Sequence, residues 1–275
     1  GYTLSKPFAL LFLGFTFWFL NSLGLIPNTR GGIIFALMLL GVISAAIAYR
    51  DRDDLRSWIE RNWTYALGIE VAFLFVFMMA VWLRSFVGTI EFTEQPMDLM
   101  FVNAAYQADK FPPGDPWLSG HTVAYYYFGY LMVAMVGKLA AVPGEVAYNL
   151  GFAMTAALAL IGGFGIVYNL VRLREDVVDP EPEPRPNEQA GFNWKPAAFG
   201  IAGALMLVVM GNLTWVLKFA SAYGIGSSGF YDWIDVQGIS ADAARESWYP
   251  SDFFGFFHGS RIYPLDNNGG YVITE

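Results

Sequence analysis

The sequence contains no cysteine and only two histidines, which lie 137 positions apart. These absences exclude thiol catalysis and cysteine-ligated metal centres, and they argue against a histidine-rich metal site. Charged residues are also scarce, at 15% of the 275 residues, and acids outnumber bases so that the net charge is −8. Because nucleic-acid phosphates need clustered Lys and Arg, we expect no nucleic-acid partner.

Apolar residues are abundant instead, at 55% of the chain. A membrane-spanning helix needs about 20 mostly apolar residues, and backbone groups in lipid must pair within the segment. The sequence therefore predicts an all-α, polytopic transmembrane helix bundle with about six spanning or near-spanning helices, and an integral, multi-pass location in the cell membrane. The six stretches are residues 8–26, 32–49, 63–87, 122–142, 146–171 and 196–219.

The intervening segments divide the chain into two regions. We expect residues 1–219 to form the transmembrane bundle, including an outer loop at 88–121 and a Pro-rich, solvated linker at 172–195. Residues 220–275 are expected to form an extramembrane region. Because the chain starts at a glycine and stops without a closing helix, we interpret it as a segment of a longer protein.

Positive charges near the helix ends predict the orientation. Residues 50–62, interpreted as a compact charged loop, carry four Arg, which favours the cytoplasm and places loop 88–121 outside. Arg and Lys at 172–195 favour the cytoplasm too, although two full crossings between these loops return the chain to the outside. Either one of these two crossings is re-entrant or broken, with Gly162, Gly163 and Gly165 favouring the fifth stretch, or the acids of the linker make the charge count misleading.

The outer loop holds the strongest candidates for chemistry. Apolar residues recur at helical spacing from Met97 to Ala108, which predicts a helix too short to span and lying at the membrane surface. Glu94 and Asp98 stand at its positive end, where their ionised forms are favoured. They are candidates for a general base or a cation ligand, and ordinary helix-capping acids are the alternative.

Several further polar and aromatic residues are candidates for substrate binding. Trp117 beside Asp115 suits carbohydrate or lipid-headgroup packing, and the alternative is an aromatic belt residue. Three consecutive tyrosines cannot all face one site on a helix. The candidate substrate-binding residues in this part of the chain are Asp115, Trp117, His121, Tyr125, Tyr126 and Tyr127.

Other charges lie within the helices and in the tail. Glu70 is an intramembrane carboxylate and by default a functional candidate, with Asn149 or Tyr148 as alternative structural partners. Arg84 can extend its charge to the membrane surface. In the tail, His258 and Arg261 are candidates for binding an anionic substrate, because Arg matches phosphate geometry, and a salt bridge is the alternative.

Three ordered blocks carry a family resemblance. The motifs Glu94-x-Pro96-Met97-Asp98, Pro112-Pro113-x-Asp115-Pro116-Trp117 and Tyr125-Tyr126-Tyr127-Phe128-Gly129-Tyr130 resemble the "YYY" family of multi-pass membrane proteins, named for its tyrosine triplet. This chain has Gln95 where that family usually has Lys. The family in turn is similar to GT-C glycosyltransferases, which take sugar from a polyprenyl-phosphate donor.

The resemblance implies a membrane glycosyltransferase-like protein acting at the outer face. It implies that Asp98 is the catalytic base, with Glu94 assisting or binding a divalent cation, and that Arg261 holds the donor phosphate. Membrane lipid and a polyprenyl-phosphate sugar donor would be its partners. The alternatives are a multi-pass transporter that uses Glu70 and a non-catalytic membrane scaffold.

Overall fold

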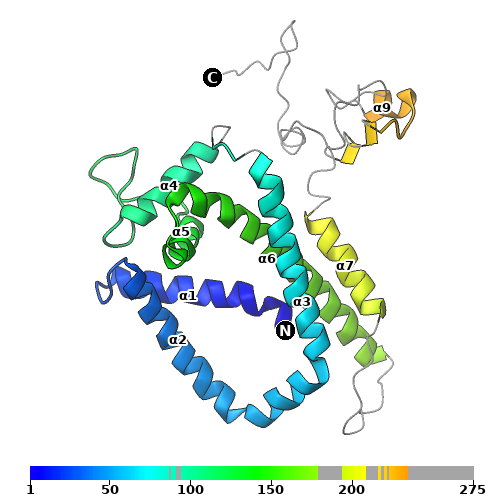
Figure 1. Cartoon of the computed structure of the whole chain (residues 1–275), viewed down its shortest axis with the longest axis horizontal. Coiled ribbons are helices and arrows are strands. Elements are labelled where there is room, and N and C mark those ends of the chain that lie inside the picture. The colour runs from blue at the N-terminus through cyan, green and yellow to red at the C-terminus, as the bar shows by residue number, and fades with distance from the viewer. Residues whose placement is uncertain are drawn as a thin grey trace, which may run out of the picture. The chain divides into compact units, whose positions relative to one another are not determined.

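The computed structural model describes residues 1–86, 88–90, 94–178, 194–208, 216–217, 220–221 and 223–234. Within them the chain is helical, with an isolated β-bridge between Gly114 and Thr122 and no strand (Figure 1). The all-α prediction is confirmed. The elements are η1 (Tyr2–Leu4), α1 (Ser5–Ser22), α2 (Arg30–Arg50), α3 (Arg52–Phe86), α4 (Gln95–Gln107), α5 (Phe128–Ala140), α6 (Gly144–Val178), α7 (Trp194–Val208) and α9 (Ser228–Ile234).

Four candidate membrane spans occur in the described part of the chain, by length and apolar composition. They are Tyr2–Ser22, Arg30–Arg50, Arg52–Phe86 and Gly144–Glu175, and α5 and α7 are shorter apolar helices. Large apolar side chains along these helices are exposed, as expected for helices that contact lipid. The predicted integral, multi-pass membrane location is confirmed.

The chain divides into two compact units, Gly1–Ala204 and Leu205–Glu275. The described residues of the second unit include α9, in which Tyr231 is buried and donates its hydroxyl to the carbonyl of Ile225. The predicted division at residue 219 stays a prediction, since residues 218–219 lie outside the described ones. The candidate functional residues that can be described all lie in the first unit.

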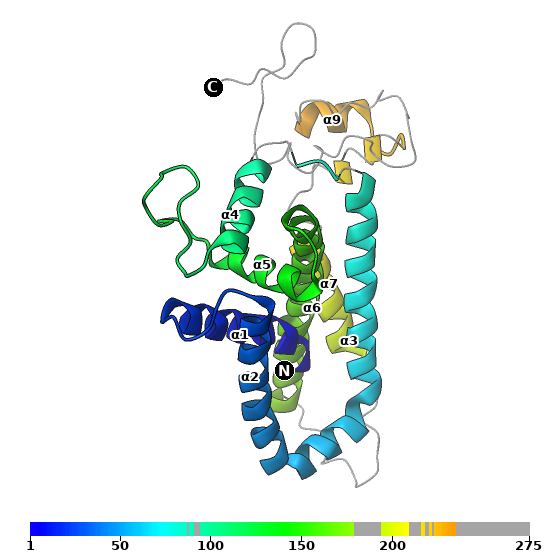
Figure 2. The ribbon, with the colours of Figure 1, turned by 60° about the vertical axis from the view of Figure 1, so that its left-hand side comes forward.

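Helices α3 and α6 form an antiparallel pair in the first unit (Figure 2). Arg84 near the end of α3 bonds to Asn149 near the start of α6, and Tyr65 stacks on Tyr168 at the other end. The C-terminal end of α6 therefore lies at the same end of the pair as the Arg-rich start of α3. The α4 helix contacts the opposite end, around the start of α6.

The fourth predicted span, residues 122–142, is not a spanning helix. Only α5 is helical there, and its 13 residues cover about 20 Å against a hydrocarbon core of about 30 Å. Residues 122–127 belong to the preceding loop instead. Among the described residues, α6 is then the one candidate span between the loop at 88–121 and residues 172–178, and with a single crossing there the predicted orientation no longer conflicts with the Arg counts.

The fifth predicted stretch is a continuous 35-residue helix, so the expected irregularity at its glycines is wrong. Gly165 lies where η1 crosses α6, and a Cβ there would collide with the side chain of Thr3. Glycine serves close packing at this position rather than a break in the helix. The helix also continues to Val178, seven residues beyond the predicted end.

The predicted charged loop at residues 50–62 is also mostly helical. Helix α2 ends at Arg50 and α3 begins at Arg52, with a kink at Asn62 whose φ is −123° and ψ is 16°. Asp53 and Asp54 stand in the first turn, where acids favour the positive helix end. Arg56 pairs with Glu60 one turn later, at 2.8 Å.

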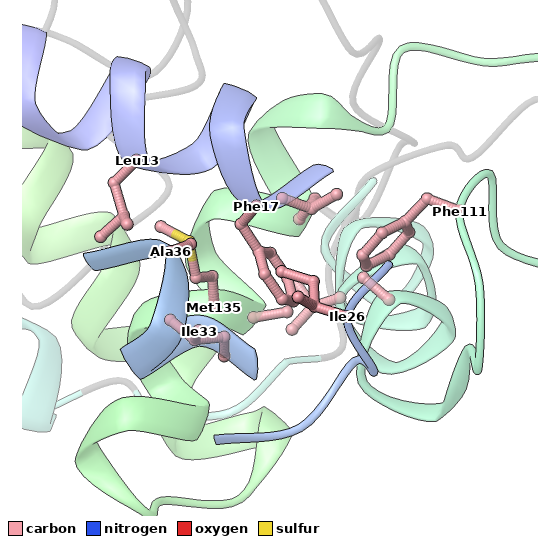
Figure 3. Packing of buried hydrophobic residues seen from close by; sticks show 11 residues of the cluster. Leu13, Phe17, Ile26, Ile33, Ala36, Phe111 and Met135 are labelled. Atoms are coloured by element: carbon pink, nitrogen blue, oxygen red, sulfur yellow. The ribbon is translucent and has the colours of Figure 1, made fainter. Parts of the chain in front are cut away.

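The main apolar core of the first unit joins α1, α2, α4 and α5 (Figure 3). Helix α1 packs on α5, where Phe17 lies beside Met135 and its ring meets the ring of Phe111 at 5.9 Å. Two side-chain amides, the buried Asn21 and the half-buried Asn28, tie this core to the end of α4. Asn21 accepts from the backbone N–H of Phe111 at 2.9 Å, and Asn28 donates to the carbonyl of Ala108 at 2.6 Å. The core thereby fixes where α4 sits.

Candidate functional site

The Asp98 carboxylate stands in the first turn of α4, the short outer helix that the apolar stripe predicts. Helix α4 begins at Gln95 with Pro96 in its first turn, a position that suits proline because no backbone donor is lost there. Phe101, Val102 and Ala105 form its buried face, so the buried stripe is centred on Val102 and not on Met97 and Met100, which are half-buried.

Two tyrosine hydroxyls meet Asp98. Tyr130 on α5 donates to Oδ1 at 2.6 Å, and Tyr148 on α6 lies 3.4 Å from Oδ2. Burial raises the pKa of Tyr130, and the hydrogen bond and charge of Asp98 raise it further. Tyr130 therefore stays a neutral donor, and the two tyrosine hydroxyls meet the half-buried Asp98 side chain where α4, α5 and α6 come together.

Arg84, a buried cation near the end of α3, bonds to the residue that follows Tyr148 on α6. Arg84 is 6% exposed, and its Nε donates to Oδ1 of Asn149 at 2.7 Å while Nη2 donates to the carbonyl of Thr89 at 3.2 Å. That Arg84 extends its charge toward the membrane surface stays a prediction. Two consecutive residues of α6 thus bond to the two charges: Tyr148 donates to Asp98, and Asn149 accepts from Arg84.

Glu70 has other partners than those expected. Its carboxylate accepts from Tyr2 at 2.7 Å and forms an ion pair with Lys6, so Asn149 and Tyr148 are not its partners. Lys6 also lies over the ring of Phe73. This pair joins the start of α1 to the middle of α3, far along α3 from Arg84 and the outer end.

An aromatic cluster adjoins the Asp98 site. Phe101, one turn after Asp98, stacks on Tyr130 at 5.4 Å and on Tyr125 at 5.3 Å, and it contacts the edge of Trp117 at 5.8 Å. Tyr126 stacks on Tyr130 in turn. Tyr130 therefore belongs to both the cluster and the carboxylate site.

The tyrosine triplet lies in the loop before α5 and not on the expected helix, and it divides between two environments. Tyr125 and Tyr126 bond through their hydroxyls and stay exposed in the aromatic cluster. Tyr127 points elsewhere: its hydroxyl accepts from the indole of Trp18 at 2.7 Å, and its ring stacks on Phe111. Tyr127 therefore anchors α1 and does not reach Asp98.

Electrostatics link the first two tyrosines of the triplet to both outer acids. The hydroxyl of Tyr126 is the main cause that raises the pKa of Tyr125 to about 12, and the charges of Glu94 and Asp98 add to it. Glu94 makes no side-chain capping hydrogen bond, so the capping alternative does not describe it. Glu94, Asp98 and Tyr125 thus share one electrostatic neighbourhood.

Asp115 and His121 have roles within their own loop. Oδ1 of Asp115 accepts from the backbone N–H groups of Trp117 and Leu118, at 2.9 and 3.0 Å, which is a turn-stabilising arrangement. The carbonyl of His121 accepts from the N–H of Asp115 at 2.8 Å, and the imidazole is exposed. Neither side chain has a contact with Asp98 among the described interactions.

Two surface grooves flank α4. One, of about 330 Å³, lies between the α1–α2 turn and residues 109–110, and the other, of about 520 Å³, lies along Leu99, Asn103 and Gln107. Residues at this spacing occupy the side of α4 away from Asp98. Asp98 lines neither groove.

Two candidate substrate-binding residues and most of the Pro-rich linker lie outside the described part of the chain. The two candidates are His258 and Arg261, and the linker residues are 179–193. Within the described part, no group of three or more His, Asp or Glu side chains is positioned to hold a metal ion.

Sequence reasoning missed Arg84, Tyr130, Tyr148 and Asn149 as members of the site. The available signal was topological: where two long helices pack antiparallel, the end of one lies beside the start of the other. Polar residues at the end of the third stretch and the start of the fifth are therefore expected to meet.

Comparison with known proteins gives a family and no function. No curated protein and no solved structure matches the chain. A family model described as "Uncharacterized membrane protein (DUF2298)" matches residues 12–275, which includes every residue of the candidate site. The chain therefore belongs to this family of membrane proteins.

Proposed function

We propose that the protein is a glycosyltransferase-like membrane enzyme that uses a polyprenyl-phosphate-linked sugar at the outer membrane face. The observation that carries the proposal is the Asp98 carboxylate, held by the hydroxyls of Tyr130 and Tyr148 at the start of an outer helix. A fixed carboxylate with unused lone pairs is suited to accept a proton from an acceptor hydroxyl.

The proposed reaction is a displacement at the sugar. Asp98 takes the proton of the acceptor hydroxyl as its oxygen bonds to the anomeric carbon. The bond from that carbon to the phosphate oxygen breaks, and polyprenyl phosphate leaves with the electron pair. Glu94, one turn before Asp98, would assist or share a divalent cation with the substrate phosphate, although two carboxylates alone supply only part of a cation's ligand shell.

The arrangement of charges supports an outer location for this chemistry. Arg residues gather at the end of the α3–α6 pair where α3 begins and α6 ends, and Asp98 lies toward the other end. By the positive-inside rule the Arg-rich end faces the cytoplasm. The sugar-bearing headgroup would meet Asp98 at the opposite surface.

The aromatic cluster supports a sugar as the substrate. Phe101, Tyr125 and Tyr126 stack within reach of the carboxylate, and Tyr125 and Tyr126 are exposed. Aromatic faces pack on the apolar faces of sugar rings while hydroxyls and carboxylates bind sugar hydroxyls. Trp117 extends this surface. His258 and Arg261 stay in the proposal as donor-binding residues of the tail.

The surroundings of Glu70 favour a structural role over transport. Its carboxylate is already engaged by Lys6 and Tyr2, and this arrangement explains an intramembrane charge without a transport pathway.

The test is transfer from a lipid-linked donor. The full chain is reconstituted in liposomes with polyprenyl-phosphate mannose or glucose, radiolabelled in the sugar, and with a panel of water-soluble hydroxyl acceptors, and transfer of label from the lipid to the aqueous phase is measured. We expect Asp98→Asn to abolish release, because it keeps the size of the side chain and removes the base. Asp109→Asn, an exposed acid beyond the end of α4, is the matched control and should retain it.

Two results would overturn the proposal. One is full activity of Asp98→Asn. The other is a folded protein that releases no label from any polyprenyl-phosphate sugar offered, which would favour a non-catalytic scaffold.

A further inference from the structure

Residues 113–123 form a closed hairpin loop, called here the outer hairpin. Its two arms pair through Val123 N–H to the carbonyl of Pro113 at 3.0 Å and Asp115 N–H to the carbonyl of His121 at 2.8 Å. An isolated antiparallel bridge between Gly114 and Thr122 completes the pairing. The hairpin is a preformed element rather than an irregular loop.

The tip of the outer hairpin satisfies its own backbone groups. The Asp115 carboxylate accepts from the N–H groups of Trp117 and Leu118, and the carbonyl of Leu118 accepts from the N–H of His121 at 3.2 Å. Gly120 has a φ of +82°, a left-handed conformation that favours glycine at the turn. A tip with few unpaired backbone groups loses little free energy when it leaves water.

The same tip presents apolar side chains outward. Trp117 is 66% exposed and Leu118 is 58% exposed. The edge of the Trp117 ring contacts Phe101 on α4, so packing holds it in this exposed position. Trp117 is therefore exposed while its ring is held in place by packing.

Charge is absent from the outer hairpin beyond Asp115. Residues 116–137 contain no Asp, Glu, Lys or Arg, and they continue directly into the apolar helix α5. A charge-free segment rich in Trp, Tyr and Leu matches the boundary between lipid headgroups and acyl chains, where aromatic rings with polar edges concentrate. A binding site for a soluble protein would not need to continue directly into an apolar membrane helix.

We propose that the outer hairpin inserts Trp117 and Leu118 into the outer leaflet at the boundary of headgroups and acyl chains. Insertion anchors the aromatic cluster, because Trp117 contacts Phe101, which stacks on Tyr130. This inference does not depend on transferase activity, since it concerns lipid contact alone.

The absence of cysteine makes the test direct. Leu118→Cys introduces a single thiol in the full chain, which is labelled with bimane after reconstitution in phosphatidylcholine liposomes. Spin-labelled lipids carrying the nitroxide high on the acyl chain quench a label at the boundary, and aqueous iodide quenches a label in water. Gln107→Cys, at the exposed end of α4, is the matched control.

We expect the label at position 118 to be quenched several-fold more by the spin-labelled lipid than the label at position 107, and less by iodide. Ser119→Cys, the next residue at the tip, repeats the measurement if the first variant folds poorly. The proposal is overturned if position 118 is quenched by iodide as strongly as position 107. It is equally overturned if neither quencher reaches it, which would mean that protein covers the tip.

Discussion

The hydroxyl of Tyr130 donates to Oδ1 of Asp98 at 2.6 Å and so joins α5 to the first turn of α4. Tyr130 also stacks on Phe101, one helical turn after Asp98. The carboxylate and the aromatic cluster are therefore held by one side chain, and their relative position depends on α5.

Replacing Tyr130 by Phe is expected to lower the free energy of unfolding by about 1–2 kcal/mol, because a hydrogen bond to a charged acceptor is lost while the stacking is kept. Tyr148→Phe should have a smaller effect, since its hydroxyl lies 3.4 Å from Asp98. Denaturant unfolding of the purified protein in detergent measures both. An equal effect of the two variants would contradict this ranking of the two contacts.

Glu70→Ala is expected to destabilise the protein more than Glu70→Gln: both remove the ion pair with Lys6, but the glutamine amide oxygen can still accept from Tyr2, whereas alanine removes that acceptor too. The double variant Lys6→Glu, Glu70→Lys should recover part of the loss by restoring the pair in reverse. Thermal unfolding in detergent checks the order. If the reversed pair is no better than Glu70→Ala, the ion pair does not hold α1 to α3.

Gly165→Ala is expected to lower the free energy of unfolding by about 1–3 kcal/mol, because the new methyl group collides with Thr3. Gly162→Ala is the matched control on the same helix: its nearest neighbour atom lies 4.0 Å away, so no such cost is expected. Thr3→Gly combined with Gly165→Ala should relieve the collision. Equal stability of the two alanine variants would show that η1 does not pack closely on α6.

Lys138 gives the protein a pH dependence. Burial lowers the pKa of its amine from 10.5 to about 8, and the amine donates to the carbonyl of Asn28 at 2.7 Å. Between these two pKa values the unfolded chain binds a proton that the folded protein does not, so stability rises as pH increases through this window. Below about pH 8 the folded protein carries the buried charge at a constant cost.

Lys138→Met should remove this rise, and the comparison is made from pH 8 to about 9.5, before tyrosines titrate in the unfolded chain. Equilibrium unfolding at each pH gives the slope for both proteins. Identical slopes would mean that Lys138 keeps its ordinary pKa in the folded state.

Much of the fold follows from local composition. The long apolar stretches at α1, α2, α3 and α6 predict spanning helices because a bilayer forces the backbone to pair internally. The helix at α4 is also predicted from its stripe, and its start follows from Pro96. For the site, local pattern singles out Asp98, Glu94 and the tyrosine triplet as chemically unusual residues.

Only the tertiary structure decides which of these residues meet. An apolar stretch such as residues 122–142 is long enough to span, yet it contains the 13-residue α5, because residues 122 and 123 pair across the outer hairpin instead of continuing the helix. The partners of Asp98 come from positions 32 and 50 residues away in the chain. Such contacts depend on how the helices cross and on which faces pack together. The spacing of residues within one helix does not determine either property.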